Sequence, residues 1–209
     1  MYVPKHFEEK DREKLLGFMR KNSFVTLVST MDSVPFASHI PLVIENNDDT
    51  IKLTGHVAKS NPHWKAFGQS ETLAIFTGPH AYISPTLYEE KSSVPTWNYI
   101  AVHAYGVPNI IEITEREKLE RMMDEIIDYY DASYKEQWHS LSEVYRTSMM
   151  KGIVAFEMTV TRLEGKYKLS QNRSTVDQHN VAEKFSKSSD PTIAETGVAM
   201  QENLEKENV

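Results

Sequence analysis

The sequence predicts a mainly β fold with helices, of the α+β class, in which antiparallel strands form a barrel and helices lie at its periphery. Three observations lead to this prediction. Runs rich in β-branched residues recur through the first half of the chain. A long β run, Trp97 to Glu112, contains Gly106 and Pro108, which can bend a strand as a closing barrel requires. From Thr114 onward the apolar residues change to helical spacing.

The first part of the chain is expected to form one helix and three strands. A helix is predicted from Asp11 to Lys21, because Asp11 can cap it and apolar residues recur on one face. The runs Ser23 to Thr30, Phe36 to Ile44 and Thr50 to Val57 are predicted to pair as an antiparallel meander. Pro41 lies inside the second run and favours a bulge or an edge position, since proline cannot donate to the ladder.

The middle of the chain continues this alternation. Asn61 and Pro62 favour an N-cap and a first turn for a short helix. Two strands, Glu71 to Gly78 and Ala81 to Ser84, then lead through a proline-bounded aromatic loop into the long β run.

The second half is expected to be helical around one last barrel strand. Thr114 and Glu117 fit a capping box for a helix that ends near Ala132. A second helix is predicted for Leu141 to Met150 and the strand for Gly152 to Leu163.

The domain organisation follows from this order. After Ser174 we expect two helical pieces, the second opened by Asp190 and Pro191. We therefore expect one domain over 1–173, with helices inserted at about 114–150, and a helical extension of the same domain over 174–209.

Composition narrows the function classes. The chain of 209 residues has a formal net charge of -7, which disfavours a protein whose main work is to grip phosphate backbones. It contains no cysteine, which excludes a disulfide framework and a Cys-ligated metal. It has no apolar run near the roughly 20 residues that span a bilayer. We expect a soluble cytoplasmic protein without a membrane partner.

Two segments can carry binding chemistry. The junction around Lys59, Ser60 and Asn61 joins a strand end to a helix start, where backbone donors and a cation favour a phosphate, although an ordinary capped helix explains the same residues. The segment Lys166 to Arg173 is basic and rich in amides, which suits an anionic ligand, nucleic acid or a solvated hairpin.

Other chemistry has less support. The histidines near strand ends show no metal-ligand spacing and are interpreted as hydrogen-bonded structural residues; they are His39, His56, His63, His80 and His103. There is no nucleophile elbow and no glycine-rich phosphate loop, so no catalytic residue is assigned.

Six ordered motifs together resemble the PaiB family. They are MYVPKHF at the start, SHIPL from Ser38, GHVAKSNPHW from Gly55, FTGPHAYISP from Phe76, VPTWNYIAVHAYG from Val94 and GKYKLSQNR from Gly165. The resemblance runs from Met1 to about Leu204. One departure is Leu87 in SPTLY, where the family commonly has a tryptophan, and this weakens any expectation of ring stacking there.

The resemblance implies a fold, a cofactor and a partner. It implies an FMN-binding split β-barrel, a Greek-key-like antiparallel barrel of six strands with peripheral helices, that forms a homodimer with flavin at the subunit interface. Lys59 would meet the FMN phosphate, and Trp64 or Trp97 would wall the ring. The remaining implied cofactor-binding residues are Ser38, His39, His56, Ser60, Asn61, Lys168, Ser170, Gln171 and Asn172.

The family is described as negative transcriptional regulators, or repressors, of protease synthesis and sporulation, so transcription regulation is the first hypothesis for this chain. A flavin-dependent oxidoreductase or a heme-handling relative is the second. A repressor that contacts DNA directly is the third, although the acidic net charge disfavours it.

Overall fold

The structure is a computed structural model, which describes residues 1–47, 50–89 and 92–207. The chain forms two compact units. Unit 1 comprises Met1–Leu15, Thr77–Val102 and Glu164–Val209, and unit 2 comprises Leu16–Phe76 and His103–Leu163. Strands β6 (Thr72–Ile83) and β7 (Thr96–Gly106) contribute residues to both units, as do helix α1 (Arg12–Lys21) and strand β10 (Arg162–Lys168).

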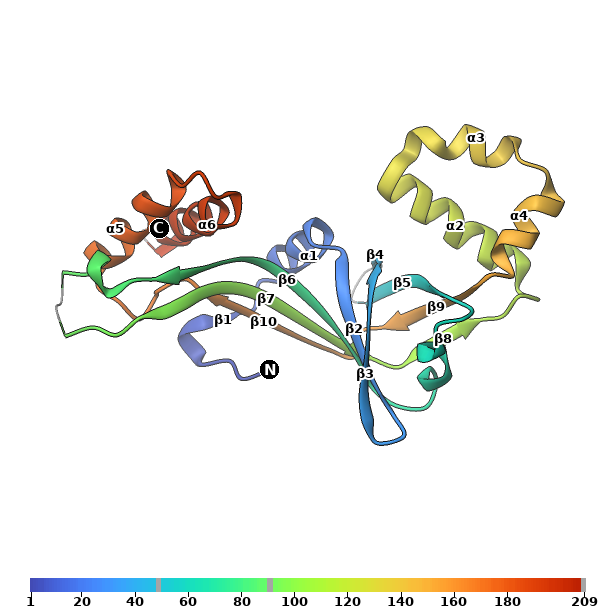
Figure 1. Cartoon of the computed structure of the whole chain (residues 1–209), viewed down its shortest axis with the longest axis horizontal. Helices are drawn as coiled ribbons and strands as arrows, with labels where there is room; N and C mark the ends of the chain where they lie inside the picture. Colours follow the sequence, from blue (N-terminus) through green and yellow to red (C-terminus); the bar gives the residue numbers. More distant parts are fainter. Residues whose placement is uncertain (48–49, 90–91, 208–209) are drawn as a thin grey trace. The chain divides into compact units, whose positions relative to one another are not determined.

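Unit 1 consists of strands and two C-terminal helices (Figure 1). Its strand order is β1-β10-β7-β6, and β1 pairs antiparallel with β10 through Glu8 opposite Lys166. Helices α5 and α6 pack on one another, and Gly197 lets α6 approach the end of α5 because a Cβ there would lie 2.2 Å from the Ser186 nitrogen. The elements not yet given bounds are η1 (Lys5–Phe7), β1 (Glu8–Glu9), η3 (Pro85–Leu87), α5 (Thr175–Ser186) and α6 (Pro191–Glu207).

Unit 2 carries the rest of the strands and the inserted helices. The order in one sheet is β6-β2-β3, and the other sheet is β4-β5-β9-β8. Helices α2, α3 and α4 follow one another between β8 and β9 (Figure 1). The bounds are α1 (Arg12–Lys21), β2 (Phe24–Met31), β3 (Val34–Pro41), β4 (Val43–Asn47), β5 (Thr50–Ala58), η2 (Pro62–Ala66), β8 (Pro108–Ile111), α2 (Arg116–Asp131), η4 (Ala132–Tyr134), α3 (Lys135–Ser140), α4 (Glu143–Met150) and β9 (Ile153–Thr159).

The expected meander is wrong. β2 and β3 form a hairpin whose two-residue turn has positive φ at Asp32 and Ser33, as the tight hairpin turns require. The run Phe36 to Ile44 is not one strand, because it divides at Leu42, whose N–H donates to the Ser23 carbonyl at 2.9 Å. β4 then pairs with β5 in the other sheet, so Pro41 ends β3 at the point where the chain changes sheet. β3 is an edge strand of its sheet, which confirms the edge position expected for Pro41.

The β run predicted from Trp97 to Glu112 also divides into two strands. It divides at Val107 into β7 and β8, which confirms the bend expected at Gly106 and Pro108. A Cβ at Gly106 would lie 2.3 Å from the Thr159 carbonyl oxygen, so the close approach to the end of β9 requires glycine. The two strands predicted between Glu71 and Ser84 form a single strand, β6.

Two helix predictions need correction. The capping box at Thr114 is wrong, because Glu115 is the N-cap of α2 and its side chain makes no capping bond to the helix. The helix predicted from Leu141 starts at Glu143, where the Ser142 hydroxyl accepts from the Tyr145 N–H, and α3 before it was not predicted.

The end of the chain follows the expected pattern with one addition. β9 ends at Thr159, before the predicted Leu163, and strand β10 contains only the first residues of the basic segment, up to Lys168. The two C-terminal helices are confirmed, with α6 beginning at Pro191. No helix in the described ranges is long and apolar enough to cross a membrane.

Candidate functional site

A buried hydrogen-bonded network surrounds His63 in unit 2. The His63 Nδ1 lies 2.9 Å from the Ser38 hydroxyl, and its Nε2 lies 2.9 Å from the Ser29 hydroxyl. The Ser29 hydroxyl in turn lies 2.7 Å from that of Thr72. Burial lowers the pKa of His63, so the neutral ring, with one donor and one acceptor nitrogen, is favoured here.

The network reaches two of the predicted site residues. The Asn61 side-chain amide donates to the Ser38 hydroxyl at 2.9 Å, and its carbonyl accepts from the His63 N–H at 3.1 Å. The second bond is the N-cap predicted for this position. Ser38 and Asn61 are therefore brought together, and His63 fixes both.

Lys59 lies at the start of the same segment. Its ammonium lies 4.6 Å from the centre of the Trp64 ring, and the Trp64 indole N–H donates to the Lys59 carbonyl at 3.2 Å. The cation and the ring are thus held as a pair. Ser60, beside Lys59, is exposed.

The backbone of this junction differs from the expected phosphate-binding helix start. The helix is a five-residue 3-10 turn, η2, which has little macrodipole. The Lys59 N–H donates to the Gly152 carbonyl at 2.8 Å, and the Asn61 N–H donates to the Ala58 carbonyl at 2.9 Å. These donors are therefore used inside the protein, and an anion here would rely on the Lys59 side chain.

His39 and His56 lie on different strands of unit 2. The exposed His39 ring lies with its Nδ1 3.1 Å from the Thr26 hydroxyl on the neighbouring strand. His56 lies on β5, and burial lowers its pKa. Its Nδ1 is buried and makes no hydrogen bond within the described part of the chain, which is the condition of an atom that a ligand hydroxyl can satisfy.

The predicted residues Trp97 and Lys168 lie together in unit 1. The Lys168 ammonium donates to the Thr96 hydroxyl and to the Trp97 carbonyl. Burial, followed by the charges of Lys166 and Arg173, lowers the pKa of Lys168. Trp97 is 53% exposed, so part of its indole is open to a ligand or a partner.

The remaining three predicted residues differ in availability. The buried Ser170 hydroxyl accepts from the Asn98 side-chain amide at 2.9 Å. The Gln171 side chain bonds the Tyr167 carbonyl at 2.6 Å and the Leu169 N–H at 2.7 Å. Asn172 is exposed. The first two side chains thus fix the turn after β10.

Several aromatic and cationic contacts near Trp97 and Tyr88 were not predicted from the sequence. Tyr82 and His80 flank the Trp97 ring, with ring centres 5.9 Å and 6.3 Å away. The Arg173 guanidinium lies 4.4 Å from the centre of the Tyr88 ring, which fixes the aromatic loop to the turn after β10. Strand alternation, which points positions 80 and 82 to one face, was the available signal.

A metal centre has no geometric support in the ranges that the structure describes. No group of three or more His, Asp or Glu side chains is close enough there to hold a metal ion. The predicted residues fall into two sets, seven in unit 2 and five in unit 1.

Comparison with protein families decides the relationship. The family described as “Putative FMN-binding domain” matches residues 1–162. The chain belongs to this family. The family description agrees with the FMN expected from the sequence.

A curated relative extends the match over the full length. The chain is 39% identical over 209 residues to “Protease synthase and sporulation protein PAI 2” of Bacillus subtilis, covering 99% of this chain and 100% of that protein. The resemblance to the PaiB family that the six motifs indicate is thereby confirmed.

Two solved structures have a fold similar to that of this chain. The FAD and heme binding protein from Mycobacterium smegmatis aligns with a TM-score of 0.59 and 14% identity, over 82% of this chain and 78% of that one. The flavocytochrome Anf3 from Azotobacter vinelandii aligns with a TM-score of 0.56 and 15% identity, over 79% and 72%. The predicted α+β split-barrel class is confirmed. The expected number of six strands is too low, because the described residues form ten strands, six in one sheet and four in the other.

Proposed function

We propose that this protein is a PaiB-like regulator that binds FMN as a homodimer and acts in negative transcriptional control of protease synthesis and sporulation. The observation that carries the proposal is the 39% identity over 209 residues to the Bacillus subtilis protein. The cytoplasmic location expected from the sequence is part of the proposal.

The residues of unit 2 support a phosphate-bearing ligand. Lys59 supplies a cation beside an indole ring, and Asn61 and Ser38 supply polar side chains that His63 holds in place. Lys59 would pair with the FMN phosphate, and the unpaired His56 Nδ1 would take a ribityl hydroxyl.

The residues of unit 1 support an aromatic anion. Trp97 offers an exposed ring that is flanked by Tyr82. Lys168 supplies a cation, which a hydrogen bond to the Thr96 hydroxyl holds in place. FMN supplies redox chemistry of its own when it is bound, whereas these side chains would bind and orient it.

The test of FMN binding is a fluorescence titration of the protein with FMN and, in parallel, with riboflavin, which lacks the phosphate. We expect Lys59→Ala to weaken FMN binding by about 10- to 100-fold, because a charge-assisted contact contributes about 1.5–3 kcal/mol. The same variant should leave riboflavin binding unchanged. Lys65→Ala is the matched control, since Lys65 is an exposed lysine on the same 3-10 helix.

The outcomes separate the parts of the proposal. No saturable binding of either flavin would refute the cofactor. Equal loss of FMN and riboflavin in Lys59→Ala would refute the phosphate contact while keeping the flavin. Turnover of NAD(P)H by the FMN-loaded protein would support an oxidoreductase in place of a regulator.

The homodimer is tested by sedimentation equilibrium over a concentration series. The chain has a mass of 24.0 kDa, and we expect twice that mass at micromolar concentrations. A single species at the mass of one chain throughout the series would refute the homodimer.

Regulation is tested with promoter DNA of the protease and sporulation genes of the source organism. Fluorescence anisotropy at low salt, with and without FMN, measures direct contact. Binding that weakens in Lys166→Ala and Arg173→Ala and falls steeply with salt would establish a DNA-binding repressor. If deletion of the gene raises protease synthesis and the purified protein does not shift the DNA, control operates through a partner.

A further inference from the structure

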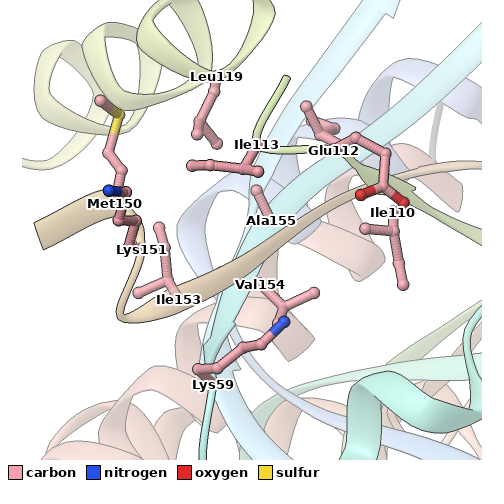
Figure 2. A pocket seen from close by; sticks show the side chains of 11 residues that line it. Lys59, Ile110, Glu112, Ile113, Leu119, Met150, Lys151, Ile153, Val154 and Ala155 are labelled. Atoms are coloured by element: carbon pink, nitrogen blue, oxygen red, sulfur yellow. The ribbon is translucent and has the colours of Figure 1, made fainter. Parts of the chain in front are cut away.

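Unit 2 contains a pocket whose lining includes only one of the predicted site residues, Lys59. Its volume is about 150 Å³, and Figure 2 shows Lys59 at one end of the lining and Leu119 and Met150 at the other. Its walls come from strand β8 and the segment after it, from strand β9 and the turn before it, and from helices α2 and α4. The lining residues are Lys59, Ile110, Ile111, Glu112, Ile113, Leu119, Met150, Lys151, Ile153, Val154 and Ala155.

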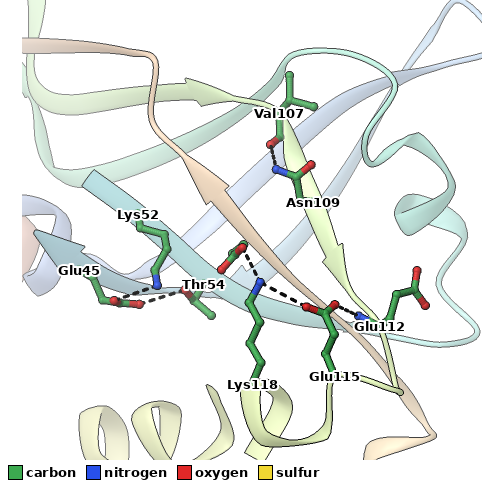
Figure 3. Close-up of polar contacts among 9 residues, drawn as sticks. Glu45, Lys52, Thr54, Val107, Asn109, Glu112, Glu115 and Lys118 are labelled. Carbon is green, nitrogen blue, oxygen red and sulfur yellow. Dashed lines mark hydrogen bonds and ion pairs between the residues drawn. The ribbon is translucent and has the colours of Figure 1, made fainter. Parts of the chain in front are cut away.

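The inserted helix α2 is fixed over this pocket by polar contacts at its first turn. The Lys118 ammonium lies 2.6 Å from the Glu157 carboxylate on β9, and the Glu115 carboxylate accepts from the Glu112 N–H at 2.9 Å (Figure 3). Leu119, the next residue of α2, is thereby held against the sheet. It packs in one buried cluster with Ile111, Met150 and Ala155.

Most of the residues that line the pocket are apolar. Isoleucine, leucine and methionine side chains form most of its walls, and Leu119, Met150 and Ala155 are nearly fully buried. A volume of about 150 Å³ is enough for a molecule the size of one benzene ring. The volume is too small for a whole flavin nucleotide, since pockets for drug-sized ligands measure about 300–1,000 Å³.

The edge of the pocket is cationic. The Lys59 N–H donates to the Gly152 carbonyl at 2.8 Å, and this bond places Lys59 beside the turn that carries Lys151. Both lysines line the pocket, against one lining carboxylate, Glu112. A ligand with an apolar body and one negative charge complements this arrangement.

We propose that this pocket binds a small amphipathic carboxylate, either a single aromatic ring or an aliphatic chain of about six carbons, whose charge pairs with Lys59 and Lys151. The apolar body fills the space between Ile113, Ile153 and Met150. The site is distinct from the flavin assignment except for Lys59, so a ligand here competes with the phosphate of FMN if both use that side chain.

The test is methyl NMR of the full chain labelled at isoleucine and methionine, titrated with hexanoate, benzoate and uncharged hexan-1-ol. We expect saturable shifts of the Ile113, Ile153 and Met150 methyl signals and none of Ile83, which lies in unit 1. Hexanoate should bind at least about tenfold more tightly than hexan-1-ol. Lys151→Ala should remove this preference, whereas Lys65→Ala should keep it.

Two variants of opposite charge at Ile113 separate an effect of charge from an effect of lost packing. Ile113 is 47% exposed, so both Ile113→Glu and Ile113→Lys should fold, which the dispersion of the methyl spectrum checks. We expect the glutamate variant to lose hexanoate binding and the lysine variant to retain it. Absence of shifts in the lining methyl signals, equal affinity for hexanoate and hexan-1-ol, or equal loss in the two Ile113 variants would each overturn the proposal.

Discussion

The Nδ1 of His63 lies 2.9 Å from the hydroxyl oxygen of Ser38, and both residues are buried. One imidazole thereby joins β3 to the 3-10 helix η2, and its other nitrogen joins η2 to β2 through Ser29. Because neutral histidine has one donor and one acceptor nitrogen, the protonation of this ring sets the direction of the hydroxyl hydrogen bonds around it.

Replacement of His63 should destabilise unit 2. His63→Leu removes two buried hydrogen bonds, each of which contributes about 0.5–1.5 kcal/mol, although Ser29 keeps Thr72 and Ser38 keeps Asn61 as partners. We expect urea denaturation to show a loss of about 1–3 kcal/mol in the free energy of unfolding. His39→Leu is the control, since that ring is exposed; equal losses in the two variants would contradict the role of the network.

Acid should destabilise the protein through His56 and His63. Burial lowers the pKa of both from 6.5 in the folded state, so the unfolded chain binds protons first as pH falls. Their contribution to stability is therefore complete above about pH 6.5 and is lost as pH falls through the folded-state pKa. His56→Gln should flatten this part of the urea-denaturation profile. An unchanged slope, equal to that of the exposed His80→Gln variant, would contradict the prediction.

Two glycines should respond in opposite directions to alanine. A Cβ at Gly106 would lie 2.3 Å from the Thr159 carbonyl oxygen and 2.8 Å from the Met158 side chain, so Gly106→Ala should cost about 3 kcal/mol. Gly17 lies in α1 with nothing within 4 Å of its added Cβ, so Gly17→Ala should gain about 0.5–1 kcal/mol. Chemical denaturation of both variants checks the contrast, and a tolerated Gly106→Ala would show that β7 and β9 can separate.

The affinity for FMN should depend on the charge of Lys168. Its pKa is lowered by burial and by Lys166 and Arg173, so the ammonium loses its proton below the ordinary lysine value of about 10.4. If this ammonium meets the ligand, FMN binding weakens as pH rises toward that value. Lys168→Arg, which stays charged, should bind FMN with a flatter pH profile. Identical profiles for the two proteins would show that Lys168 does not meet the anion.

The sequence and the structure agree where local chemistry decides. The Asn61 cap, the two C-terminal helices and the bend at Gly106 follow from residues close together in the chain. The predictions failed where a distant partner decided. The run at Phe36 to Ile44 alternates like one strand, yet Leu42 donates to Ser23 and the chain changes sheet.

The candidate site shows the same division. The motif around Lys59 predicted a cation at the junction, and the structure adds that its ammonium lies over the Trp64 ring. The pattern did not reveal that the Lys59 N–H is already bonded to Gly152, or that Gln171 is used to fix its own turn.

By itself, the sequence determined the family, through six ordered motifs and a full-length match, and the class of fold, through periodicity and turn residues. Only the tertiary structure decided which polar groups are consumed by the protein and which remain for a ligand. It also created the pocket between the inserted helices and β9. Hydrogen-bond satisfaction and cavity shape depend on residues far apart in the chain, and no local pattern encodes those distances.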